Sequence, residues 1–299
     1  MLCPMISIDC GSRDLAIQSL SAICGVDRTA LERSIREVDT EDDAKWVNDD
    51  NERIPYYSYI ALVLEKKFGF REDDIGHVYY YHWSRRYQGG NFDEGILPLN
   101  KAIVPIWGQL IKMFNYDNTI ANRLRDKQIK GDLLACDQFL LDEPHRAGPW
   151  AMLADERMDY CQNHYLRELP EIIRDICVWY ETEYGESIEG RVKDALRPCV
   201  VKFVIPYDEV IKFNPIGGLV SYCAQIVSTY KGRDDESCPN VESYYDGNGR
   251  AVPPSRICGV EWIDEIPSRN IPSSTNDAMP KFTQVGNRIY IEWPSSAEL

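Results

Sequence analysis

The clearest β-strand in the chain is residues 199–206 (CVVKFVIP), where a single lysine interrupts an otherwise apolar run. Such a run is typical of a strand that is buried in a sheet. A second strand is predicted at His77–Trp83 (HVYYYHW), because aromatic residues favour a pleated and largely buried surface. Segments with helical periodicity lie on both sides of these strands, so we expect a core in which helices pack against a sheet.

Helical patterns dominate the N-terminal part of the chain. Ser12 is expected to cap a helix that Gly25 ends, and Asp27 is expected to cap a second helix that runs to residue 38. A third helix is predicted over Pro55–Phe68, because proline is favoured in the first turn of a helix.

The rest of the chain alternates between the two patterns. Helices are predicted over residues 97–114, 118–141, 171–184 and 219–230, and strands over residues 150–154, 251–266 and 282–293. The last strand segment is expected to be a hairpin that turns at Gly286–Asn287. This order indicates an α+β protein with an N-terminal helical subdomain (1–72) and a mixed α+β domain (73–299) that holds the candidate catalytic site.

The chain is strongly acidic: its 299 residues include 48 acidic side chains against 33 Lys and Arg, a formal net charge of −15. A protein that grips nucleic acid over its whole surface needs a cationic footprint, so the composition argues against this class and leaves room only for a local basic groove. The same balance disfavours anchoring to an anionic membrane face.

Two charged segments allow alternative interpretations. Residues 37–52 hold eight acidic residues against Lys45, which is typical of a solvated loop; the alternative is an electrostatic surface for a basic partner. One predicted helix carries a basic face, for which the alternatives are a solvated surface and a contact with nucleic acid. The members of this face are Arg123, Arg125, Lys127 and Lys130.

The ten cysteines form no CxxC pair, so the chain lacks the ligand spacing of a zinc ribbon or finger, and no metal site is predicted. They are too dilute for a small disulfide scaffold, and we expect reduced and mostly buried thiols. The N-terminus lacks the layout of a signal peptide, and no apolar run is long enough to cross a bilayer. These features predict a cytoplasmic protein without a membrane segment.

The most informative segment for function is Tyr79–Leu99 (YYYHWSRRYQGGNFDEGILPL). Side chains alternate along a strand, so His82 and Ser84 are expected on one face and Tyr81 and Trp83 on the other. A lone histidine beside a strand is usually structural, and this interpretation competes with a role in binding.

Arg85 follows at the expected end of the strand, and the next glycines, Gly89–Gly90, permit a tight turn or the close approach of a ligand. A guanidinium suits phosphate, while imidazole and hydroxyl groups can bond a ribose. We therefore predict a polar ligand site, and expect His82 and Arg85 to converge on one cavity.

The segment YHWSRR followed by NFDEGILPL resembles the first core strand and the following turn of the ADP-ribosyltransferase superfamily. This resemblance implies a split β-sheet core with NAD bound in its cleft as a substrate. It implies that His82 and Ser84 hold the ribose next to nicotinamide and that Arg85 lies near the pyrophosphate. The remaining members of the implied NAD site are Tyr81, Gly95 and Trp150, the last as a stacking partner for the nicotinamide.

In this superfamily a carboxylate near the last part of the sheet completes the site, because it stabilises the oxocarbenium-like centre that forms as nicotinamide leaves. Glu242 is the first choice for this acid, with Asp246 and Glu261 as alternatives; the competing interpretation of Glu242 is a solvated loop position. None of these three candidate acids belongs to a Glu-x-Glu or Gln-x-Glu pair like that of the arginine-modifying branch, which puts a protein arginine target in doubt.

The resemblance thus implies an NAD-dependent mono-ADP-ribosyltransferase of the toxin or host-defence kind, with a protein or a nucleic acid as acceptor and a cognate inhibitor as a further partner. The alternative is a non-enzymatic interaction protein, such as an immunity protein, whose acidic surface binds a basic partner. The sequence alone leaves both hypotheses open.

Overall fold

The computed structural model of the chain describes residues 5–39, 46, 52–87, 91–130, 147–154, 169–229, 244–263, 281–285 and 288–292. The chain divides into two compact units, Met1–Asp264 and Glu265–Leu299. The first unit contains the sheet and the candidate site, and the second contains a hairpin.

The first unit is built on an open, mostly antiparallel sheet in the strand order β5-β3-β2-β4-β6, with β1 added in parallel beside β2. The strands are β1 (Ile6–Ile8), β2 (Ile75–Tyr87), β3 (Trp150–Met152), β4 (Leu196–Pro206), β5 (Tyr244–Asp246) and β6 (Ile257–Trp262). The mixed helix-and-sheet class is therefore as predicted. This architecture is compatible with many α+β proteins, and the split sheet of ADP-ribosyltransferase type stays a prediction.

Helices occupy most of the remaining described residues. They are α1 (Arg13–Cys24), α2 (Arg28–Asp39), α3 (Tyr56–Phe68), α4 (Leu99–Met113), α5 (Asn118–Lys130), α8 (Glu171–Tyr184), α9 (Glu189–Ala195), α10 (Tyr207–Val210) and α11 (Ile216–Thr229), with 3-10 turns at Glu72–Asp74 and Pro254–Arg256.

The predicted ends of the first helices are confirmed by their capping contacts. The Ser12 hydroxyl accepts the backbone N–H of Leu15 at 3.2 Å, and Gly25 ends α1 in the left-handed region at φ 65°. An Asp27 carboxylate oxygen accepts the backbone N–H of Ala30 at 2.8 Å and begins α2. Such caps satisfy backbone groups that have no partner inside the helix.

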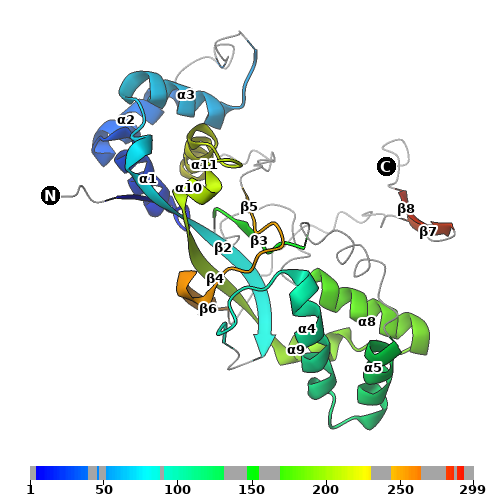
Figure 1. Cartoon of the computed structure of the whole chain (residues 1–299). Helices are drawn as coiled ribbons and strands as arrows, with labels where there is room; N and C mark the ends of the chain where they lie inside the picture. The colour runs from blue at the N-terminus through cyan, green and yellow to red at the C-terminus, as the bar shows by residue number, and fades with distance from the viewer. Residues whose placement is uncertain are drawn as a thin grey trace. The chain divides into compact units, whose positions relative to one another are not determined.

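The pairing of β2 with β4 is the longest in the sheet. Its antiparallel register is unbroken from His77 opposite Pro206 to Tyr87 opposite Leu196. Figure 1 shows the two long strands side by side, and this strand pair is called here the β2–β4 ribbon. Both strands are longer than predicted, since β2 also includes residues 75–76 and 84–87 and β4 also includes residues 196–198. The two strands together position every described candidate residue of the segment 79–87.

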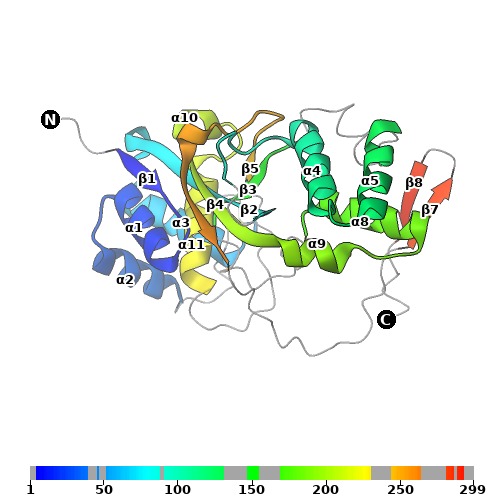
Figure 2. The same ribbon diagram turned by 90° about the horizontal axis from the view of Figure 1, so that it is seen from below.

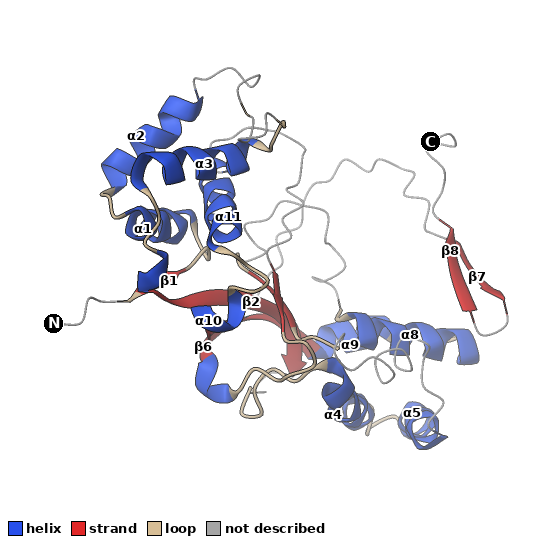
Figure 3. Cartoon of the chain, turned by 45° about the horizontal axis from the view of Figure 1, so that its top comes forward, coloured by secondary structure: helices blue, strands red, loops and turns tan. Residues whose placement is uncertain are grey.

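Two hydrophobic cores form around this ribbon. Helices α1, α2, α3, α10 and α11 share the first core with one face of the sheet, where the Tyr80 ring lies 5.9 Å from that of Phe203 and 5.3 Å from that of Tyr245. Figure 3 shows α1, α3 and α11 together over this end of the sheet. Residues on both sides of the predicted subdomain boundary at 72/73 contribute to this core, and the boundary stays a prediction.

The second core joins α4, α5, α8 and α9, and Figure 2 shows α5 beside α8. The Arg123 guanidinium lies 4.2 Å from the centre of the Tyr184 ring and donates to the Tyr180 hydroxyl at 3.0 Å. The Lys127 ammonium lies 5.2 Å from the Trp179 ring. These members of the predicted basic helix face therefore pack on aromatic rings of α8, where cation–π attraction helps to hold the two helices together.

The second unit contains the hairpin β7 (Lys281–Val285) and β8 (Arg288–Glu292). Val285 pairs with Arg288, so two residues connect the strands at the predicted turn position, 286–287. Among the helices of the described segments, none has the length and apolar character needed to span a bilayer.

Gly95 has a structural role in joining the segment after β2 to a distant loop. Its φ is 81°, and a Cβ at this position would lie 2.1 Å from the carbonyl oxygen of Val252. The next residue, Ile96, exchanges two backbone hydrogen bonds of 2.9 Å with Val252. Only glycine combines this backbone conformation with such a close approach.

The replacement Gly95→Ala is expected to lower the free energy of unfolding by about 2–4 kcal/mol, because it adds strain at positive φ to a clash with the backbone. The matched control is Gly108→Ala in α4, where an added Cβ meets nothing within 4 Å. That change should raise stability by about 0.5–1 kcal/mol, since alanine favours the helix. Urea unfolding midpoints measure both effects, and equal midpoints for the two variants would contradict this account of Gly95.

Candidate functional site

The register of β2 against β4 separates the predicted site residues onto two faces. Tyr81 pairs with Lys202 and His82 with Val201, so alternate side chains point to opposite sides of the sheet, as predicted. One side belongs to the first hydrophobic core. The other side, called here the aromatic face, carries Tyr79, Tyr81 and Trp83 from β2, Trp150 from β3 and Tyr244 from β5.

His82 lies on the core side, where it holds the neighbouring strand. Its Nδ1 is 2.7 Å from the carbonyl oxygen of Trp150. Because a carbonyl can only accept, Nδ1 carries the proton and donates, which leaves Nε2 with a lone pair. Burial disfavours the charged imidazolium and lowers the pKa of His82, so the ring is neutral near pH 7. Ser84 shares this side of the sheet and is paired with Cys199.

Arg85 points to the opposite side from His82, because β2 does not end before it but continues to Tyr87. One Arg85 nitrogen donates to the carbonyl oxygen of Leu196 at 3.0 Å and lies 3.5 Å from that of Lys193. These carbonyls lie at the C-terminal end of α9, where a cation is favourable. The structure therefore does not bring the imidazole and the guanidinium together in one cavity.

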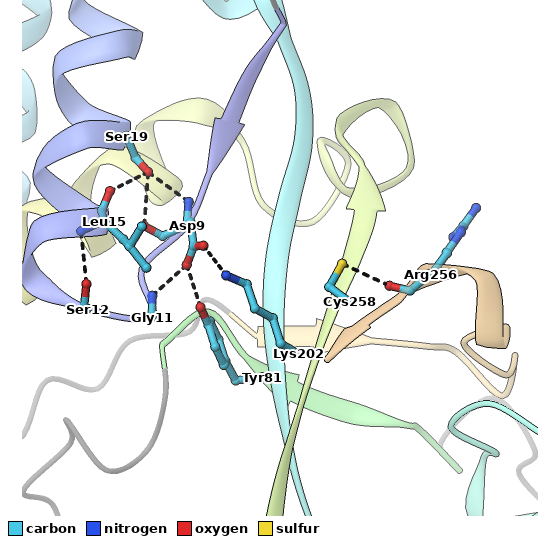
Figure 4. Close-up of polar contacts among 9 residues, drawn as sticks. All are labelled: Asp9, Gly11, Ser12, Leu15, Ser19, Tyr81, Lys202, Arg256 and Cys258. Atoms are coloured by element: carbon cyan, nitrogen blue, oxygen red, sulfur yellow. Dashed lines mark hydrogen bonds and ion pairs between the residues drawn. The ribbon is translucent and has the colours of Figure 1, made fainter. Parts of the chain in front are cut away.

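Tyr81 belongs to a polar cluster that the sequence did not reveal. Its hydroxyl donates to the Asp9 carboxylate at 2.6 Å, and Lys202 pairs with the other carboxylate oxygen at 2.5 Å. The backbone N–H of Gly11 also donates to Asp9, at 2.9 Å. Figure 4 shows the Asp9 carboxylate between Tyr81 of β2 and Lys202 of β4, with the start of α1 on its other side.

This Asp9 cluster ties the loop between β1 and α1 to the sheet. The hydroxyl of Ser19 accepts the backbone N–H of Asp9 at 2.9 Å, and a Cβ on Gly11 would lie 1.7 Å from the Tyr81 hydroxyl oxygen. A groove of about 550 Å³ lies beside the cluster, with Asp9, Ser19 and Tyr79 in its lining. Because both carboxylate oxygens of Asp9 already accept hydrogen bonds, its first role is structural.

The exposed part of the aromatic face is the pair Trp150 and Tyr244. Their exposed fractions are 46% and 43%, and their ring centres lie 5.2 Å apart at an angle of 53°. The carbonyl oxygen of Trp150 accepts from His82, and that of Tyr244 accepts from Asn214 at 3.1 Å. Two large rings are thus held at the surface by a backbone that is fixed from the core side.

The three candidate acids are placed differently. Asp246 is the register partner of Trp150, and one of its carboxylate oxygens accepts the backbone N–H of Asn248 at 2.7 Å. Glu261 lies opposite Val200 on β6, at the other edge of the sheet. Glu242 lies outside the described residues.

Most of the acidic segment 37–52 also lies outside the described residues. Of its described members, Glu37 accepts a hydrogen bond from Lys67 at 2.8 Å. In the part of the chain that the structure covers, no group of three or more His, Cys, Asp or Glu side chains is placed to hold a metal ion.

One sequence signal could have identified the Asp9 cluster. Lys202 interrupts an apolar strand, and a charge inside such a strand requires a partner of opposite sign or a route to water. The position of that partner, almost two hundred residues earlier, carries no local signal.

Comparison with known proteins does not assign a family. No family model matches the chain, and no curated protein or solved structure is significantly similar to it. The likeness of residues 79–99 to ADP-ribosyltransferases therefore stays a prediction.

The lowered pKa of His82 predicts a pH dependence of stability. The unfolded chain takes up a proton near pH 6.5, whereas the folded chain takes it up at lower pH, so the free energy of unfolding should fall as the pH drops below about 6.5. His82→Asn retains a donor for the Trp150 carbonyl and does not titrate, so its stability should fall less between about pH 7.5 and about pH 5.5. Urea unfolding at the two pH values checks this, and parallel losses in both proteins would contradict it.

The Asp9 cluster predicts a difference between two tyrosines of β2. Tyr81→Phe removes a buried hydrogen bond to Asp9 and should cost about 1–2 kcal/mol of unfolding free energy. Tyr79→Phe keeps the ring that lies 4.4 Å from the Lys202 ammonium, leaves the contacts of Asp9 in place and should cost less than about 0.5 kcal/mol. Chemical denaturation compares the two, and an equal loss would count against the cluster as a stabilising contact.

Proposed function

We propose that the chain binds NAD on the aromatic face of its sheet and transfers ADP-ribose to a macromolecular acceptor. The observation that carries this proposal is the exposed Trp150–Tyr244 pair, next to the strand that resembles the first core strand of ADP-ribosyltransferases. Large exposed rings are costly to leave in water and are well suited to stack on the planar rings of a nucleotide.

Stacking gives the pair a physical role in binding. Each base that stacks on an aromatic side chain contributes about 1–3 kcal/mol, and the contact tolerates different planar rings. The backbones under Trp150 and Tyr244 are held by His82 and Asn214, so less conformational freedom is lost when a ligand binds. In this proposal His82 is a positioning residue for β3.

Strand order favours one of the candidate acids. Neighbouring strands lie about 4.8 Å apart, and Asp246 lies on β5 directly beside Trp150 of β3. Glu261 is separated from β3 by β2 and β4, so it is about 14 Å away across the sheet. Of these two acids, Asp246 is the better placed to stabilise positive charge at a ribose whose nicotinamide stacks on Trp150.

The reaction follows from the resemblance. The bond between the nicotinamide nitrogen and the ribose carbon breaks, the electron pair leaves with nicotinamide, and a nucleophile of the acceptor bonds to the same carbon. A fixed carboxylate lowers the energy of the positively charged centre between these steps. The acceptor remains a protein or a nucleic acid in this proposal.

The test measures binding and transfer with the full chain. NAD at a hundred times its dissociation constant should stabilise the protein by about 2.7 kcal/mol, and label from the adenylate part of NAD should pass to a component of a cell lysate. Trp150→Ala should weaken NAD binding at least tenfold with little change in stability, because its ring is exposed.

The matched control is Tyr116→Ala, which removes another ring, 75% exposed, that packs near the second core. It should bind NAD like the wild type. A wild-type protein that is folded but shows neither a thermal shift nor transferred label would overturn the proposal.

The second candidate is a non-enzymatic protein that binds a basic partner through its acidic surface. The net charge of −15 favours it. Binding to such a partner weakens as ionic strength rises, because salt screens exposed charges. A protein of this kind has no NAD site, so NAD should leave its unfolding temperature unchanged. The NAD titration therefore separates the two functions.

A further inference from the structure

Two buried cysteines from distant parts of the chain lie in contact beside the Asp9 cluster. The sulfur atoms of Cys10 and Cys223 are 3.2 Å apart, although the residues are 213 positions apart in the sequence. Both side chains have no exposed surface. Cys10 lies in the loop between β1 and α1, and Cys223 lies in α11.

The surroundings of Cys10 favour its protonated thiol in the reduced protein. The contact with Cys223 and the burial of the site both raise the pKa of Cys10 well above its usual value. Cys24 is also buried in the same core, and burial raises its pKa to about 12. Of the described cysteines, Cys258 alone is exposed.

We propose that Cys10 and Cys223 are a site of oxidative modification, at which hydrogen peroxide forms a disulfide that joins the β1–α1 loop to α11. A disulfide has an S–S length of about 2.0 Å, so the sulfur atoms need to approach by roughly 1.2 Å. A movement of this size is within reach of small rotations of the two side chains and the flanking loop.

The chemistry balances with peroxide as the oxidant. The thiol of one cysteine loses its proton and its sulfur attacks a peroxide oxygen. The O–O bond breaks, which gives a sulfenic acid and hydroxide, and the hydroxide takes up the released proton as water. The second thiol then attacks the sulfenic sulfur, the S–O bond breaks and a second water leaves. In sum, two thiols are oxidised to one disulfide, and one peroxide is reduced to two waters.

The position of the bond links it to the sheet. Cys10 follows Asp9, whose carboxylate holds Tyr81 and Lys202. A covalent tie at Cys10 restricts the loop that carries this carboxylate, and so resists the opening of β1 and α1 from β2 and β4. The expected result is a more stable oxidised protein, because the bond closes a long loop in the unfolded chain.

The experiment treats the full chain with hydrogen peroxide, alkylates the remaining thiols after denaturation and maps the peptides by mass spectrometry without reduction. The expected product is a pair of peptides, one with Cys10 and one with Cys223, joined by a disulfide. Its mass is lower than the sum of the two reduced peptides by the mass of two hydrogen atoms. The unfolding temperature of the oxidised protein should exceed that of the reduced protein by roughly 5–10 °C and return after dithiothreitol.

Each variant is compared with its own reduced form, so differences in basal stability cancel. Cys10→Ala and Cys223→Ala should abolish the rise in unfolding temperature, and the control Cys24→Ala should retain it. Oxidation of Cys258 shows that peroxide has acted. The proposal is wrong if Cys258 is oxidised while Cys10 and Cys223 both still react with the alkylating reagent. It is also wrong if Cys10 or Cys223 forms a disulfide with a different cysteine. The peptide map of the wild-type protein decides between these outcomes even if a variant fails to fold.

Discussion

The unbroken pairing of β2 with β4 is the constraint on which the rest of the structure depends. At one end of the strand pair, Val78 and Ile205 belong to the first hydrophobic core. At the other end, Leu196 belongs to the second core and Tyr87 packs against it. A shift of the register by one residue would exchange the two faces of the strand, moving Tyr80 out of the core and the aromatic face into it. The two cores and the candidate site therefore depend on the same register.

A charge inside the ribbon adds a second constraint. Lys202 lies in the middle of β4, where its side chain is only one-third exposed and meets the buried Asp9. Removing either partner would leave the other charge poorly solvated, which is far more destabilising than losing an exposed pair. This requirement explains why the β1–α1 loop returns to the sheet and why it needs Gly11 where Tyr81 approaches.

Helix ends could be predicted from the sequence because their signals are local. Ser12, Asp27 and Gly25 act within a few residues of their own positions, and the structure confirms all three. Strand ends could not be predicted in this way, because the charged residues near them contact distant segments. Arg85 donates to a carbonyl at the end of α9, and the Arg197 guanidinium lies 5.8 Å from the Trp262 ring. Three-residue strands such as β1 and β5 are too short for a periodic pattern to show.

The same distinction between local signals and distant contacts applies to the candidate site. The alternation of Tyr81 and His82 follows from the strand period, so their separation onto two faces was predictable. The contact of Tyr81 with Asp9, and that of His82 with the Trp150 carbonyl, depend on how distant segments meet. Sequence reasoning thus identified the strand and the exposed Trp150 as features of interest, but not what each side chain does there.

The contacts of Lys202 and Arg85 restrict the class of ligand that could bind on the aromatic face. Lys202 is paired with Asp9, and Arg85 bonds the carbonyls at the end of α9. Recruiting either one to a phosphate would leave a buried carboxylate or a helix end without its partner, and that loss is comparable in free energy to the phosphate interaction itself. Under the proposed function, stacking on Trp150 and Tyr244 is therefore the main source of affinity that the described residues of this face offer. This favours a dinucleotide, with its two planar rings and modest charge, over a compact polyphosphate.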